Sequence, residues 1–118
     1  MGKRFMHYKR YEDWSVRRNA LQAIEDAIKK YSDRFKIVED EDAWVYWLIP
    51  KNSKYYYKLA VFTCHDDNER WWFETETTRV DAETDIEDDD LGMVDLDLCE
   101  STEKGIIRCL PSLMKELA

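Results

Sequence analysis

Apolar side chains recur at helical spacing over residues 13–31, which predicts an amphipathic helix there. Asp13 or Ser15 can cap its first turn. Glu25 precedes Lys29 by four positions, an arrangement typical of the solvated side of a helix. The apolar positions of this helix are Ala20, Leu21, Ile24, Ala27, Ile28 and Tyr31.

After the helix the pattern changes to runs of β-branched and aromatic residues, separated by short clusters of turn-forming residues. This order predicts an antiparallel meander in which each run pairs with the next one along the chain. The expected strands are Phe35–Glu39, Ala43–Ile49, Tyr55–Cys64 and Arg70–Thr78.

Residues 79–100 carry ten carboxylates and, after Arg79, no lysine or arginine. Acidic and apolar residues alternate over 80–87 and again over 94–98, which predicts two further strands with one charged face each. We expect these strands to form a hairpin that turns around residues 88–92. A solvated acidic loop is the alternative.

Helical spacing returns over residues 106–117, with Ser101 or Thr102 available as a cap. Pro111 removes one backbone hydrogen bond, so we expect a bent helix or two short ones. The predicted fold is a single α+β domain over residues 1–118. It is an antiparallel β-meander of four to six strands, with an N-terminal amphipathic helix and a Pro-kinked C-terminal helix packed on the sheet.

The 118 residues include 18 basic and 26 acidic side chains, for a net charge of −8. Residues 1–36 hold ten basic and five acidic groups, whereas residues 37–118 hold eight basic and twenty-one acidic groups. This balance argues against attraction of the whole chain to nucleic acid or to an anionic membrane. We expect the basic amino-terminal stretch to be a solvated terminus or a counter-charge for the acidic sheet, with a nucleic-acid contact as the alternative.

No apolar run approaches the roughly 20 residues that a membrane span needs, so we expect a soluble, cytoplasmic protein. Only three glycines are present and they are far apart, which excludes a glycine-rich phosphate loop. The cysteines match no paired-thiol zinc spacing, and a calcium loop begun at Asp85 lacks the required glycine and final glutamate. We therefore expect no enzyme activity, no cofactor and no metal.

The regular spacing of the acids indicates a use for them. Like-facing residues repeat about every 6.6–6.8 Å along a strand, so the acids at alternate positions from Asp81 to Glu87 would form a row of negative charge. Such a row imitates a phosphate backbone and suits the basic groove of a nucleic-acid enzyme. A solvated acidic surface without a partner is the alternative.

The predicted sheet is also rich in Trp and Tyr, and because neighbouring residues alternate faces they cannot all enter one core. If one helix covers each face, nearly all of them are sealed. Otherwise, an exposed Trp/Tyr surface beside carboxylates is typical of a protein-binding hot spot. The partner-binding candidates are Asp81, Glu83, Asp85, Glu87, Asp88, Asp89, Asp90, Trp44, Tyr46 and Trp72.

We therefore expect a small acidic, non-enzymatic inhibitor that binds a nuclease or other nucleic-acid-processing enzyme and blocks its basic groove. In size and charge alone the chain resembles toxin-immunity proteins and phage anti-CRISPR or anti-restriction proteins, a resemblance that transfers no residue. The alternative is a structural or adaptor protein that assembles through an aromatic sheet face, including as a homodimer. Direct contact with nucleic acid or a membrane is not expected.

Overall fold

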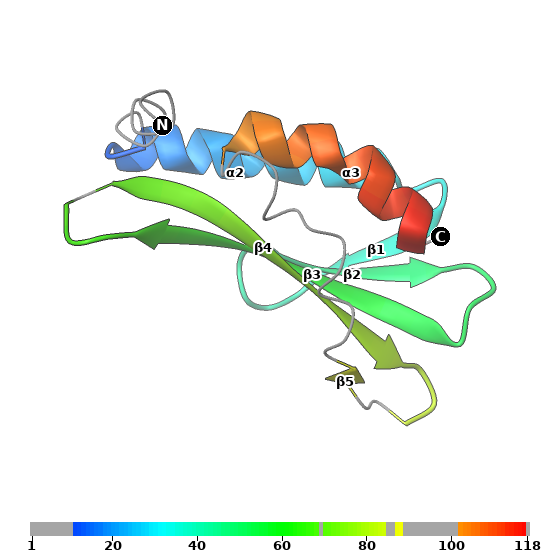
Figure 1. Ribbon diagram of the computed structural model, residues 1–118. Coiled ribbons are helices and arrows are strands. Elements are labelled where there is room, and N and C mark those ends of the chain that lie inside the picture. Colours follow the sequence, from blue (N-terminus) through cyan, green and yellow to red (C-terminus); the bar gives the residue numbers. More distant parts are fainter. Residues whose placement is uncertain (1–10, 69, 85–86, 89–101, 118) are drawn as a thin grey trace.

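The computed structural model describes residues 11–68, 70–84, 87–88 and 102–117, and within these ranges it is an α+β fold (Figure 1). Helix α2 spans Trp14–Lys29 and helix α3 spans Glu103–Leu117. The strands are β1 (Phe35–Glu39), β2 (Val45–Pro50), β3 (Tyr55–His65), β4 (Trp71–Asp81) and β5 (Glu87–Asp88).

The strands form one antiparallel sheet in the order β1-β2-β3-β4-β5, so each strand pairs with the next one along the chain. β3 and β4 pair over their whole lengths, from Tyr55 opposite Asp81 to His65 opposite Trp71. The predicted meander of four to six strands is therefore confirmed.

Helix α2 begins at the predicted cap. Asp13 Oδ1 accepts hydrogen bonds from the hydroxyl and the backbone N–H of Ser15, both at 2.8 Å, and these bonds lower the pKa of Asp13. The cap satisfies a backbone N–H that the first turn of a helix leaves without an intrahelical partner. Leu21, Ile24 and Ile28 on one side of α2 are buried, as the apolar spacing predicts.

Helix α3 is one continuous helix with Pro111 in its interior, not two short helices. Proline has no N–H, so Pro111 cannot donate the usual helical hydrogen bond to the carbonyl of Ile107. Pro111 itself is exposed, while Leu110, Leu113 and Met114 are buried. No helix within the described ranges is long and apolar enough to cross a membrane.

Both helices lie on the same side of the sheet and contact each other (Figure 1). Their buried residues form one cluster with core-facing residues of the strands, including Leu48, Leu59 and Phe73. The arrangement with one helix on each face is therefore not the one adopted. The second face of the sheet carries neither α2 nor α3.

Tyr11 joins the segment before α2 to both the other helix and the sheet. Its hydroxyl donates to the carboxylate of Glu103 at the start of α3, and both side chains are buried. Its ring also meets Phe73 of β4 edge to face, with 4.8 Å between ring centroids. Segments more than ninety residues apart in sequence are thereby held together.

The acidic segment folds differently from the expected hairpin over its described part. β4 ends at Asp81, residues 82–84 form a turn, and β5 pairs back so that Val80 lies opposite Glu87. The chain therefore reverses before residue 87, earlier than the predicted turn at 88–92. Residues 89–101, which include the second predicted acidic strand, lie outside the described residues.

Replacing Ile28 with alanine tests how α2 is docked. Ile28 is fully buried between α2 and the sheet, so Ile28→Ala is expected to lower the free energy of unfolding by about 2–5 kcal/mol. Urea denaturation followed by circular dichroism measures the change. Val38→Ala, on the face without helices, is the control and is expected to stay within about 0.5 kcal/mol of the wild type. A loss that small for Ile28→Ala would contradict the observed packing.

Candidate functional site

The side of the sheet that faces away from α2 and α3 is the candidate interaction surface, and we call it the open face. Because side chains alternate along a strand, the register of the sheet assigns its members. They are Lys36 and Val38 of β1; Val45, Trp47 and Ile49 of β2; Tyr56, Lys58, Ala60, Phe62 and Cys64 of β3; and Trp72, Glu74, Glu76, Thr78 and Val80 of β4.

Trp47 is an aromatic side chain of the open face that several contacts hold in place. Its Nε1–H donates to Asp40 Oδ2 at 2.7 Å, and its ring meets Tyr56 edge to face at 5.3 Å between centroids. The Lys58 ammonium lies 5.9 Å from the centroid of the Trp47 ring. Opposite Trp47 on the edge strand, Val38 is 40% exposed. A ring fixed in this way loses little freedom when a partner covers it.

A second apolar area lies near the hairpin between β3 and β4, where carboxylates accompany the aromatics. Phe62 is 43% exposed and lies opposite Glu74 in the register. Trp72 donates its Nε1–H to Glu74 Oε1 at 3.0 Å. The pKa of Cys64 is raised to about 11, mainly because the thiol is buried and also because of the nearby charge of Glu74. This thiol therefore stays protonated at neutral pH, which argues for a packing role and against a nucleophilic one.

Not all of the open face is accessible to a partner. Ala60, Thr78 and Val80 are buried even though they point away from the helices. The accessible apolar area is therefore divided between the surroundings of Val38 and those of Phe62.

Two of the three predicted aromatic contact residues lie elsewhere. Tyr46 is only 1% exposed, on the core side of β2, and its hydroxyl donates to Glu25 Oε1 at 2.9 Å. Burial and this bond raise the pKa of Tyr46. Trp44 precedes β2 with a φ of 66°, in the left-handed region that a Cβ disfavours, and its half-buried ring packs against the core. Trp72 is the one aromatic candidate on the open face.

The predicted row of acids is interrupted where it was expected to begin. Asp81 Oδ1 accepts hydrogen bonds from the backbone N–H groups of Glu83 at 2.9 Å and Thr84 at 3.2 Å, which lower the pKa of Asp81. These bonds stabilise a turn, so Asp81 and Glu83 are not spaced as like-facing residues of one strand. Glu83 is exposed within this turn.

The remaining acidic candidates are less well placed by the structure. Glu87 and Asp88 form β5 and pair with Val80 and Arg79. Asp85, Asp89 and Asp90 lie outside the described residues, and their role in partner binding stays a prediction.

The sequence of β4 does contain a pattern that identifies the solvent-facing side of the sheet. Glu74 and Glu76 share a face with Trp72, and consecutive carboxylates on one face indicate the solvent side of a strand. The observed pairing of Glu76 with Ala60, and of Ala60 with Val45, extends that side to Trp47. The exposed positions Phe62 and Val38 follow from the same register and were not among the candidates.

The described residues were also compared with metal-binding arrangements, and the chain with known proteins. Among the described residues no group of three or more His, Cys, Asp or Glu side chains is arranged to hold a metal ion. No protein-family model, no curated protein and no solved structure matches this chain.

A pH-dependent stability test addresses the anchoring of Trp47. The amide of Asp42 and the indole N–H of Trp47 bind the Asp40 carboxylate and hold its pKa below the usual value of 3.8. A lowered pKa contributes stability above the unfolded value, and this contribution is lost as the pH falls through the folded value. We expect Asp40→Asn to be less stable than the wild type at pH 7, with the difference shrinking between pH 4 and pH 2.

Urea unfolding across this pH range measures the difference. Asp42→Asn is the control, because it removes a neighbouring charge but keeps the backbone N–H that binds Asp40. A wild-type advantage over Asp40→Asn that stays constant down to pH 2 would show that ionised Asp40 is not what holds Trp47.

Proposed function

We propose that the protein is a non-enzymatic inhibitor that binds a nucleic-acid-processing enzyme, with the open face as its contact surface. The observation that carries this proposal is the exposure of Phe62 and Val38 on a sheet face that neither helix covers. The two residues lie in separate apolar areas of the same face, and two such areas on one face favour a protein partner that contacts both, whereas single exposed residues need no explanation.

The composition of the open face supports a protein partner. Large aromatic side chains supply most of the binding energy in interfaces, and polar groups around them exclude water. Trp47 and Trp72 are each oriented by a hydrogen bond to a carboxylate, while Phe62 is free to enter a pocket of the partner. The face therefore combines fixed aromatic area with a charged surround.

The charge of the chain favours a basic partner surface. The net charge is −8, with the excess of acids in residues 37–118, and Glu74 and Glu76 are exposed on the open face itself. A groove lined by Lys and Arg for phosphates would attract this surface and accelerate encounter. In this proposal the acids over residues 81–90 steer association, and the cytoplasm is where the two proteins meet.

The second candidate is a structural or adaptor protein that assembles through the same face. It is favoured by the presence of Lys36 and Lys58 on the open face together with Glu74 and Glu76. A surface that carries both signs can complement a second copy of itself, as two-fold interfaces require.

The decisive experiment identifies a partner by affinity capture and then measures binding kinetics with matched variants. Phe62→Ala is expected to accelerate dissociation roughly thirtyfold, since truncating an anchor costs about 2 kcal/mol. Trp14→Ala is the control, because Trp14 is a large exposed aromatic residue on α2, away from the open face. Equal dissociation rates for Phe62→Ala and the wild type would exclude the open face as the contact surface.

Neutralising charged residues separates their effect on the rate of association from the effect of contact residues on the rate of dissociation. The combined variant Glu74→Gln and Glu76→Gln is expected to slow association and to flatten its salt dependence, with little effect on dissociation. The same outcome is expected when Asp81, Glu83, Asp85 and Glu87 are neutralised together.

The partner's activity decides between the two candidate functions. A captured nuclease should lose activity when the protein is added in equimolar amount, and regain it with Phe62→Ala. If light scattering instead shows a dimer that Phe62→Ala dissociates, the adaptor function replaces the inhibitor.

A further inference from the structure

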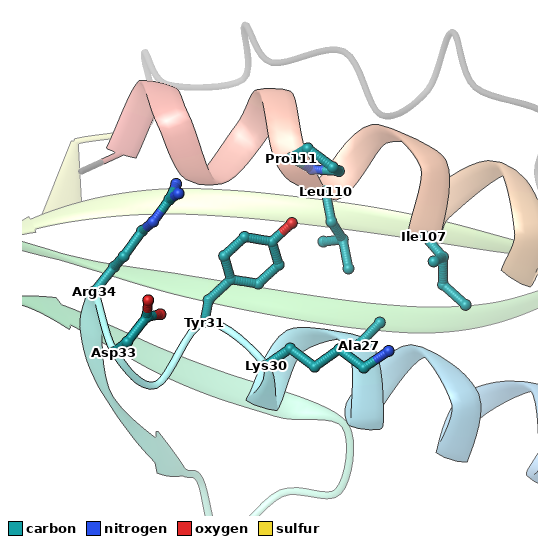
Figure 2. A pocket seen from close by; sticks show the side chains of 8 residues that line it. All are labelled: Ala27, Lys30, Tyr31, Asp33, Arg34, Ile107, Leu110 and Pro111. Atoms are coloured by element: carbon teal, nitrogen blue, oxygen red, sulfur yellow. The ribbon is translucent and has the colours of Figure 1, made fainter.

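A cleft in the helix layer offers a site of a different chemistry from the open face. It has a volume of about 320 Å³ and lies between the end of α2 and the middle of α3 (Figure 2). This volume is at the lower end of the range of roughly 300–1,000 Å³ for small-molecule sites. Its lining residues are Ala27, Lys30, Tyr31, Asp33, Arg34, Ile107, Leu110 and Pro111.

The backbone around the cleft is fixed by the turn that follows α2. The carbonyl of Tyr31 accepts hydrogen bonds from the N–H groups of Arg34 at 3.0 Å and Phe35 at 3.1 Å. Tyr31 is half-buried against the core, and Phe35 is buried. The lining from α2 and the following turn is therefore formed before any ligand arrives.

The cleft is amphiphilic. Ala27, Ile107, Leu110 and Pro111 provide an apolar wall, and the side chains of Tyr31 and Arg34 extend toward α3 (Figure 2). Lys30 and Arg34 lie on opposite sides of Tyr31, and Asp33 is the one acid of the lining (Figure 2). The lining thus carries a net positive charge on a chain whose net charge is −8.

Arg34 is the group best suited to hold an anion. Its guanidinium lies 5.9 Å from the centroid of the Tyr31 ring, and Tyr31 stands between Arg34 and Leu110 in the cleft (Figure 2). A guanidinium presents a planar fork of N–H donors that matches both oxygens of a carboxylate, which an ammonium such as that of Lys30 cannot do.

We propose that this cleft binds small amphiphilic carboxylates. The apolar body of the ligand, a short acyl chain or one aromatic ring, covers Ile107 and Pro111, and its carboxylate accepts hydrogen bonds from Arg34. Lys30 adds attraction from the other side of Tyr31. The site uses no residue of the open face, so its failure and the failure of the proposed function are separate results.

Octanoate is the probe, and 1-octanol is its uncharged match with the same chain length. Titration of the ¹⁵N-labelled protein with each compound follows the backbone amide signals. We expect octanoate to shift the signals of residues 27–34 and 107–111, and to bind at least about fivefold more tightly than 1-octanol, as for one partly exposed ion pair.

Two variants test the role of Arg34. Arg34→Gln is expected to weaken octanoate binding about fivefold and to leave 1-octanol binding unchanged. Lys104→Gln is the matched control, because it removes a cation from the exposed side of α3 outside the cleft lining. Unshifted signals elsewhere in the spectrum show that each variant is folded.

Three results would overturn the proposal. These are equal affinities for octanoate and 1-octanol, unchanged octanoate binding by Arg34→Gln, and shifts that map to the open face around Phe62 in place of the cleft.

Discussion

The packing of both helices on one face of the sheet is the constraint on which the rest of the structure depends. Ile24 and Ile28 of α2, with Leu110 and Leu113 of α3, bury one side of the sheet that the described residues form. Burial of each such side chain contributes about 1.5–3 kcal/mol to the stability of the folded state. With both helices on this side, neither α2 nor α3 covers the aromatic residues of the other face.

The local patterns of the sequence predict most of this fold, because they depend on neighbours a few residues apart. The cap at Asp13, the apolar side of α2 and the order of the hairpins follow from such spacing. The placement of α3 beside α2 does not, because it depends on a connection of about twenty residues whose sequence does not determine to which side of the sheet it returns. The alternation of acidic and apolar residues in that connection predicted a strand through Asp81, and this was wrong. The Asp81 carboxylate accepts hydrogen bonds from two backbone N–H groups, and these bonds favour a turn.

The candidate site was harder to predict than the fold because β2 is apolar on both sides. Trp44, Tyr46 and Leu48 alternate with Val45, Trp47 and Ile49, so periodicity alone cannot identify the exposed set. Tyr46 was chosen as a contact residue and is a core residue, bonded to Glu25. The pairing register resolves the ambiguity, since it places the exposed glutamates of β4 and Trp47 on one face.

The bond between Tyr11 and Glu103 also bears on how the chain matures during synthesis. Strands β1 to β4 are complete once residue 81 has been made, but α3 begins only at Glu103, so until then the core-facing side of the sheet lacks its second helix. At a translation rate of about 5–20 residues per second, residues 85–117 take about 2–7 s to appear. During this interval Leu48, Leu59 and Phe73 are screened by α2 alone, and the nascent protein presents two apolar sheet surfaces where the finished one presents a single open face. Chaperones that recognise exposed apolar segments would therefore find their best opportunity in this interval, before Glu103 reaches Tyr11.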